Sequence, residues 1–222
     1  MTTFVLVPGA CHGAWWFEPL ARRLREHGHQ AYPLTLTGIG ARKHQLAASV
    51  NLDTHIDDVV NLLEDEEITD AVLVGHSYAG MVITGAADRA PDRVEGLVYL
   101  DAFLPSDGDS CWTLTTDAQR EWYIGGSAAT GYGVEPLPLF GERTTPHPLA
   151  SLLQRIRLSG ELSRFKRKDY VYATEWGGAE SPFRPAYERA SQDPSFRVHA
   201  LKTRHNVMRE VPDEILRILL EG

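Results

Sequence analysis

The stretch AVLVGHSYAGM, residues 71–81, decides the fold of this chain. Ala71–Val74 is a continuous apolar run, which is typical of a strand buried on both faces, and a helix is expected from about Met81 to Asp88. Between them lies a G-x-S-x-G sequence whose serine is Ser77. Between a strand and a helix this motif forms a nucleophile elbow, a tight turn that exposes the serine hydroxyl. A purely structural turn is the alternative, but the context favours the elbow, with Ser77 as nucleophile.

Strand and helix patterns alternate on both sides of this stretch. Short apolar runs predict strands, and amphipathic runs predict the helices between them. The expected strands are Phe4–Val7, Ala31–Leu36, Gly96–Leu100, Tyr170–Ala173 and Phe196–Leu201. Trp16, Leu20 and Leu24 recur at helical spacing and predict a helix that Gly28 stops. Further helices are expected after Asp53, as a possible cap, and over Pro185–Ser191 and Pro212–Leu220. Such alternation predicts an α/β fold with a mostly parallel sheet flanked by helices.

The expected organisation is a single domain, residues 1–222, because this length suits one hydrophobic core. The core is expected at residues 1–102 and 166–222. The segment of about 103–165 is rich in Gly, Pro, Thr and Trp and has little periodicity. We therefore expect it to form a small cap or lid insertion over the carboxyl edge of the sheet.

Composition excludes several classes of function. The chain has 22 basic and 30 acidic residues, a formal charge of −8, and no basic cluster, so nucleic acid and anionic membranes are not expected partners. No apolar run approaches the roughly 20 residues that span a bilayer, and the N-terminus lacks a signal-peptide pattern. Two cysteines suggest free thiols and a cytoplasmic location. A small-molecule substrate is expected, and the sequence is compatible with a homodimer.

A serine nucleophile needs a base, and His205 is the best placed of the nine histidines. It lies in LKTRHNVMREVP, between the last expected strand and the last helix, after the serine in chain order. His55, like His27, His29 and His44, falls on a polar segment and is expected at the surface. His76, inside the elbow, is expected to be structural. No histidines or cysteines have metal-ligand spacing, so neither a metal nor another cofactor is expected.

An oxyanion requires backbone N–H groups that converge on one point. Tyr78, the residue after the nucleophile, supplies one candidate amide. The loop PGACHGAWW, residues 8–16, follows the first strand and allows a tight reversal that exposes the amide of Ala10. A plain strand-to-helix turn would also explain this loop, but its position opposite the elbow favours Ala10 and Tyr78 as the oxyanion hole.

Several blocks together resemble the α/β-hydrolase superfamily: FVLVPGACHGAWWFEPLARRL, TLTGIGARKHQ, VGHSYAGM, LVYLDAFLP and RHNVMREVPDE. More narrowly, they are similar to the plant hydroxynitrile lyase and methylesterase family and its bacterial esterase relatives, over about residues 3–105 and 168–220. Hydroxynitrile lyases of that family carry a threonine where Gly9 stands and a lysine where Asn206 stands. Without that charged lysine, the resemblance implies a serine esterase that hydrolyses an ester, lactone or thioester through an acyl-enzyme.

The acid that would complete a Ser-His-acid triad is open between carboxylates. Glu175 follows the penultimate strand, near the usual acid position, and Glu180 lies farther along and is expected to face solvent. Asp101 ends the apolar run LVYLDAF, where certain haloalkane dehalogenases on this fold place their acid. A simple cap near Ala102 would also explain Asp101. Because a carboxylate that closes an apolar run needs a partner, we favour Asp101 and keep Glu175 as the rival.

The substrate pocket is expected to be apolar, with Cys11, His12 and Trp15 on one wall and Trp112 and Trp122 in the lid. The lid's other large residues are Tyr123, Tyr132, Leu137, Leu139 and Phe140. Alternatively, the aromatic residues of the lid would simply pack the insertion on the core. His12 could likewise be a buried residue that is hydrogen-bonded to the backbone. The expected guest is a small to medium apolar or aromatic acyl group.

Two other functions remain open at this point. A biosynthetic cyclase or lyase would use the same pocket without an acyl-enzyme, and a hydrolase-like binding protein would hold a small molecule with little turnover. The intact set of nucleophile, base and oxyanion loop favours catalysis over binding.

Overall fold

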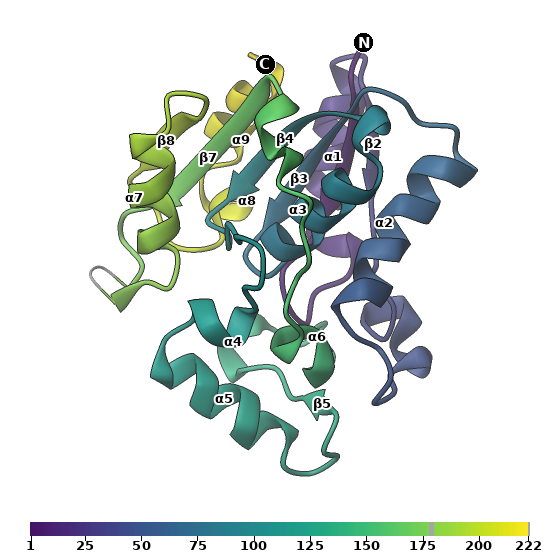
Figure 1. Cartoon of the computed structure of the whole chain (residues 1–222), viewed down its shortest axis with the longest axis vertical. Helices are drawn as coiled ribbons and strands as arrows, with labels where there is room; N and C mark the ends of the chain where they lie inside the picture. Colours follow the sequence, from purple (N-terminus) through teal and green to yellow (C-terminus); the bar gives the residue numbers. More distant parts are fainter. Residues whose placement is uncertain (178–179, 222) are drawn as a thin grey trace.

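The computed structural model describes residues 1–177 and 180–221, and its main element is a six-stranded sheet of parallel strands. The strands lie in the order β2–β1–β3–β4–β7–β8 (Figure 1). Their bounds are Thr3–Val7 (β1), Gln30–Pro33 (β2), Ala71–His76 (β3), Val94–Leu100 (β4), Arg167–Ala173 (β7) and Arg197–Leu201 (β8). The predicted α/β fold with a mostly parallel sheet is therefore confirmed.

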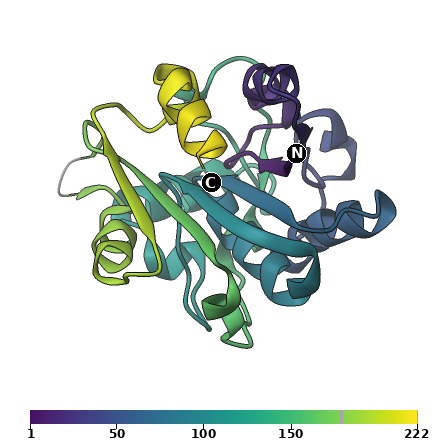
Figure 2. The same ribbon diagram turned by 90° about the horizontal axis from the view of Figure 1, so that it is seen from above.

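Helices cover both faces of this sheet (Figure 2). One face packs against α1 (Glu18–Glu26), α8 (Val207–Glu210) and α9 (Pro212–Leu220). The other packs against α2 (Leu52–Asp65), α3 (Ala79–Arg89) and α7 (Arg184–Gln192). The strands are thus buried on both sides, which explains why they read as unbroken apolar runs in the sequence.

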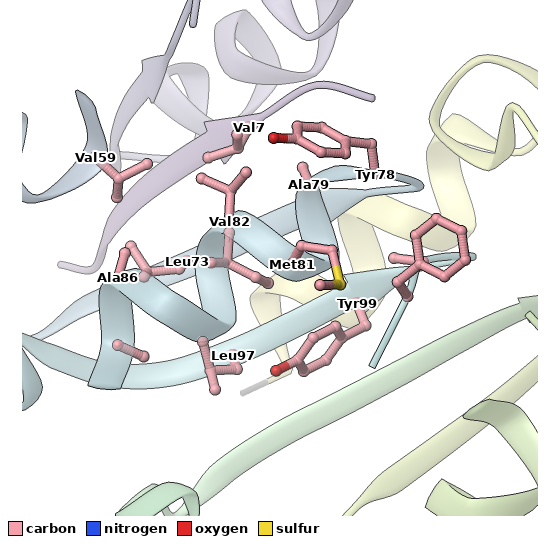
Figure 3. Packing of buried hydrophobic residues seen from close by; sticks show 14 of the residues in the cluster. Val7, Val59, Leu73, Tyr78, Ala79, Met81, Val82, Ala86, Leu97 and Tyr99 are labelled. Carbon is pink, nitrogen blue, oxygen red and sulfur yellow. The ribbon is translucent and has the colours of Figure 1, made fainter. Parts of the chain in front are cut away.

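Alternate residues of each central strand point into opposite layers. Leu73 packs with Val82 of α3 and Leu97 of β4 in one hydrophobic cluster (Figure 3), whereas Val72 and Val74 belong to the cluster on the other face. The two-residue period of a strand makes this division automatic. Both clusters meet at β3, which places the end of that strand, and the elbow after it, on a rigid support.

Two local expectations are wrong. The first turn of α2 is capped by Asn51 rather than Asp53: Asn51 Oδ1 accepts a hydrogen bond from Thr54 N at 3.1 Å, and Thr54 Oγ1 accepts one from Asn51 N at 3.3 Å. This reciprocal pair is a capping box, and it leaves the Asp53 carboxylate to accept a bond from Gln154. The expected strand Ala31–Leu36 instead begins at Gln30 and ends at Pro33.

The segment expected as the cap gathers at one end of the molecule, toward which the arrowheads of β3 and β4 point (Figure 1). It contains α4 (Cys111–Leu114), α5 (Asp117–Ser127), α6 (Leu149–Leu153) and a small antiparallel pair, β5 (Gly133–Val134) with β6 (His147–Pro148). Among the described residues, no helix is long and apolar enough to cross a membrane.

Gly80, in the first turn of α3, lies at the point where this helix approaches the loop after β4 most tightly among the glycines described. A Cβ at Gly80 would lie 1.9 Å from the carbonyl oxygen of Phe103, so Gly80→Ala forces backbone to move. We expect Gly80→Ala to lower the free energy of unfolding by about 3 kcal/mol, as overpacking in a tight core does, measured by urea denaturation.

Gly125 in α5 is the matched control, because a Cβ there meets nothing within 4 Å. Removing a helical glycine at an open position should raise stability by about 0.5–1 kcal/mol. If Gly80→Ala and Gly125→Ala changed the free energy of unfolding equally, helix propensity and not the contact with Phe103 would determine the effect of Gly80→Ala.

Candidate active site

Ser77 sits in the turn between β3 and α3 in a backbone conformation that side-chain-bearing residues rarely adopt. Its φ is +57°, in the left-handed region. The conformation is held from both sides, because Ser77 N donates to Leu100 O at 3.3 Å and Ser77 O accepts from Phe103 N at 3.1 Å. Gly75 is required there, since a Cβ would come within 2.8 Å of Ala79 O. Ser77 is half-buried while its neighbours are buried, so the turn presents this one side chain.

Asp101 follows the end of β4, directly beside the elbow. It too has a positive φ, +44°, and its side chain is completely buried. Asp101 N donates to Val171 O at 2.7 Å, and the carboxylate oxygen Oδ1 accepts from Ala173 N at 3.1 Å. One carboxylate oxygen is thus fixed by the backbone of β7, and the other is directed toward the loop after β8.

His205 occupies that loop and meets the second oxygen. Its Nδ1 lies 2.7 Å from Asp101 Oδ2. An ionised carboxylate only accepts, so Nδ1 carries the hydrogen, and Nε2 of a neutral ring holds the lone pair. The ring packs against Trp176 (centroids 4.4 Å apart, 21°), Phe183 (5.2 Å, 8°) and His76 (4.5 Å). The imidazole is therefore fixed in orientation by one hydrogen bond and three rings.

The rival carboxylates lie elsewhere. Glu175 is exposed, with Lys202 Nζ 3.9 Å from its Oε1, and Glu180 is exposed as well. The segment after β7 supplies Trp176 to the histidine in place of an acid. Sequence reasoning missed Trp176 and Phe183, since aromatic residues in a Gly-rich loop carry no signal of what they stack on.

The loop after β1 brings Gly9 and Ala10 against the elbow. A Cβ at Gly9 would lie 3.0 Å from both Ser77 Cβ and His76 Nδ1, so a larger residue at this tight contact would have to displace its neighbours. Among the described residues, neither the Ala10 amide nor the Tyr78 amide donates a hydrogen bond to another protein group. α3 begins at Ala79, so its positive N-terminal end points at the same place.

Cys11, in the same loop, has an unfavourable backbone conformation that hydrogen bonds from the predicted cap stabilise. Cys11 has a φ of +67° and is fully buried. Thr145 N donates to Cys11 O at 3.1 Å, and Cys11 N donates to His147 Nδ1 at 3.3 Å. Both polar groups of the Cys11 backbone are thus bound by one short segment of the insertion, and its thiol presents no surface to a ligand.

A buried polar network continues from His147 beneath the elbow. Because His147 Nδ1 accepts from Cys11, its Nε2–H donates to Ser151 Oγ at 2.9 Å. The His147 ring packs on Tyr78 (4.6 Å), whose hydroxyl donates to His55 Nδ1 at 2.7 Å. Burial lowers the pKa of His147 well below its usual range, so this ring stays neutral. The network therefore links Cys11, in the loop after β1, to the side chain of Tyr78, the residue after Ser77.

The expected surface position of His55 is wrong, because the residue is fully buried and its Nε2–H donates to Thr37 O at 2.9 Å. The signal was present, since His55 falls at helical spacing on the buried face of α2 with Leu52, Ile56 and Val59. His147 had no comparable signal. His76 is buried, as expected of a structural residue, and its Nε2–H donates to His205 O at 3.1 Å.

The other predicted pocket residues lie around this loop and in the insertion. His12 is buried, and its Nδ1–H donates to Ala10 O at 2.7 Å. Trp15 and Trp112 are half-buried, and Trp122 donates from Nε1 to Glu135 O at 2.8 Å. Among the described residues no group of His, Cys, Asp or Glu is arranged to hold a metal ion. Cys11 and Cys111 are both free thiols.

The buried histidines predict a pH dependence of stability. Burial lowers the pKa of His55 to about 4, below the roughly 6.5 of an unfolded histidine. The unfolded chain therefore binds the proton first, so stability is full above about pH 6.5 and falls as the pH drops toward 4.

We expect His55 to contribute a loss of up to about 1.4 kcal/mol per pH unit in that window, measured by urea unfolding from pH 7 to 4.5. The stability difference between wild type and His55→Asn should narrow as the pH falls. His44→Asn, at an exposed position, should leave the wild-type slope unchanged. If the free energies of unfolding of wild type and His55→Asn differed by the same amount at every pH, His55 would not be the source of the pH dependence.

Comparison with known proteins agrees with this fold. The family model described as "Alpha/beta hydrolase family" matches residues 4–218. The chain is 38% identical over 236 residues to a "Carbendazim hydrolyzing esterase" from Nocardioides sp. (strain SG-4G), covering 97% of each. It is 35% identical over 103 residues to "Methylesterase 10" of Arabidopsis thaliana, covering 46% of this chain and 38% of that protein.

Among solved structures, the fold is similar to an "Extracellular alpha/beta-hydrolase from Paenibacillus species", described as sharing structural and functional homology with tobacco salicylic acid binding protein 2. The TM-score is 0.85 and the identity 26%, over 100% of this chain and 98% of that one. The chain belongs to the alpha/beta hydrolase family, and its relatives include esterases from bacteria and plants.

Proposed function

We propose that this protein is a serine esterase that hydrolyses a small to medium ester, lactone or thioester through an acyl-enzyme on Ser77. The observation that carries the proposal is the 2.7 Å contact of His205 Nδ1 with the buried carboxylate of Asp101, beside a half-exposed serine in a strained turn. The full-length similarity to an esterase supports the same reaction class.

In the acylation step, Ser77 Oγ attacks the carbonyl carbon of the substrate while its proton passes to Nε2 of His205. The C–O bond to the leaving alcohol then breaks, and Nε2 returns the proton to the departing oxygen. Water repeats the sequence on the acyl-enzyme and releases the acid. Asp101 keeps the hydrogen on Nδ1 and stabilises the imidazolium that forms in each half-reaction.

The negative charge that develops on the carbonyl oxygen is received by the amides of Ala10 and Tyr78. Among the described residues, neither donor is paired with a protein group. The network of His147 and His55 binds Cys11, the neighbour of Ala10, and contacts the side chain of Tyr78. Fixed dipoles of this kind need no reorganisation when the charge appears, which makes them effective in catalysis.

The lyase alternative is less well supported. Asn206, at the position of the lyase lysine, is neutral and forms the N-cap of α8. It supplies no positive charge to a cyanide leaving group, and Gly9 leaves room at the elbow for an acyl group.

Ser77→Ala tests the mechanism. We expect a loss of at least about 1000-fold in kcat/KM for p-nitrophenyl acetate, because the nucleophile is removed. Intact-mass analysis should show a fluorophosphonate adduct on the wild type and none on the variant. Ser191→Ala is the matched control, since this exposed hydroxyl bonds only Tyr187 O on α7 and should leave both results unchanged. Turnover retained by Ser77→Ala, with wild-type protein unlabelled, would favour chemistry without an acyl-enzyme.

Asp101→Asn and Glu175→Gln together test the acid. Asn cannot hold the same histidine tautomer, so we expect Asp101→Asn to lower kcat by about 100-fold or more with its fold intact by circular dichroism. Glu175→Gln should retain kcat within about twofold, because Glu175 is exposed and only loosely paired with Lys202. A collapse of kcat confined to Glu175→Gln would reverse the assignment.

A further inference from the structure

Two arginines beside the proposed active site carry charges that no carboxylate of the described residues pairs. Arg143 comes from the insertion and Arg209 from α8, so they meet where these two parts of the chain face each other. Within the described residues neither forms an ion pair, whereas Arg217, also near the C-terminus, contacts two glutamates. Glu210, next to Arg209 in sequence, is turned toward Thr203 and Arg204.

The two guanidinium groups are held over adjacent indole rings. Arg143 Cζ lies 4.5 Å from the centroid of Trp15, and Arg209 Cζ lies 4.6 Å from that of Trp16. The two indoles are 5.3 Å apart and nearly perpendicular, at 84°. Arg209 also donates to Trp15 O at 3.3 Å. Stacking fixes the plane of a guanidinium while leaving N–H groups at its edge free to bind an acceptor.

Holding these like charges together is unfavourable without an anion. Partial burial lowers the pKa of Arg209, and the charge of Arg143 lowers it further. A bound anion would relieve this repulsion, and the described part of the chain provides no carboxylate to either side chain. The pair is thus a local positive site on a protein whose formal charge is −8.

The site is linked to the reaction centre through His12. The His12 ring lies 4.3 Å from Trp16 and 5.6 Å from Trp15, and its Nδ1–H donates to the carbonyl of Ala10. Arg209 is four residues beyond His205, on the short helix that follows it. One ring therefore separates the indole pair from the residue that bears the proposed oxyanion amide.

The unpaired groups in this cluster are mostly donors. Trp15 Nε1 and Trp16 Nε1 are buried without a hydrogen-bond partner, as is His12 Nε2, and the guanidinium edges add further N–H groups. Because the indole nitrogens are fully buried, the exposed guanidinium edges are the groups that can reach a ligand. Guanidinium groups donate and never accept, so an acceptor with negative charge is the complementary ligand. A planar carboxylate suits the two-pronged geometry of arginine best.

We propose that Arg143 and Arg209 form a subsite for a carboxylate that the ester substrate carries at a distance from its scissile carbonyl. The proposal rests on the proposed esterase function and adds a substrate class to it, the half-esters and carboxylated aryl esters. The carboxylate belongs either to the acyl part or to the alcohol part of the ester. The group that the arginines recognise is the same in both cases.

Matched ester pairs test the subsite. For the acyl part, kcat/KM is compared between 4-nitrophenyl hemiglutarate and 4-nitrophenyl pentanoate. For the alcohol part, 3-acetoxybenzoate is compared with 3-acetoxybenzamide. In at least one pair, Arg143→Gln and Arg209→Gln should each lower the ratio of charged to neutral ester by about tenfold, as loss of a charge-assisted hydrogen bond does. Arg209→Lys should retain part of the preference, and 0.5 M salt should weaken it.

Arg217→Gln is the control, because it removes an equal charge from an exposed position on α9 and should leave both ratios unchanged. Ratios that stay constant in the Arg143→Gln/Arg209→Gln double variant would overturn the proposal. Equal losses on charged and neutral esters would also overturn it, since they would show that the arginines only hold the insertion in place.

A binding measurement separates this proposal from the esterase function. Glutarate titration, followed by tryptophan fluorescence in the Ser77→Ala variant, should saturate, and the added double substitution should abolish the response. If wild type hydrolyses neither ester pair but glutarate binds through the arginines, the esterase function fails and the anion site stands. If hydrolysis proceeds and glutarate leaves the fluorescence unchanged, the subsite fails alone.

Discussion

The site depends on a left-handed backbone conformation at the ends of two neighbouring strands. Ser77 adopts it after β3, and Asp101 adopts it after β4. Each conformation is unfavourable for a residue with a side chain, and each is held by backbone bonds to the adjacent strand or loop. The parallel sheet makes this arrangement possible, because both strands end at the same edge. The close approach of Gly80 to Phe103 locks the two turns together.

The insertion supports the loop that carries one of the proposed oxyanion amides. Its segment at Thr145 and His147 binds both polar groups of the Cys11 backbone, and the His147 ring rests on Tyr78. The residues beside both proposed oxyanion donors are therefore supported by one buried network. The same insertion places Arg143 over Trp15, so it would bear on turnover and on substrate choice.

Sequence patterns predicted the sheet, most of its strands and helices, and the elbow, because apolar periodicity and the G-x-S-x-G turn are local properties. Local competition misled the prediction where several polar residues were candidates for one task. Asn51 caps α2 in preference to Asp53, since Thr54 completes a capping box with it. His55 was assigned to the surface from its polar neighbours, although helical spacing put it on the buried face.

The sequence by itself determined the fold class and the candidates for nucleophile and base, because strand, turn and helix propensities act within a few residues. It left the carboxylate open between Asp101 and Glu175, and it was silent on Trp176, His147 and the arginine pair. Only the tertiary structure decided which carboxylate meets the histidine and which side chains surround it. Those contacts join segments as far apart as Trp15 and Arg209, which are 194 residues apart, and no local pattern encodes such a distance.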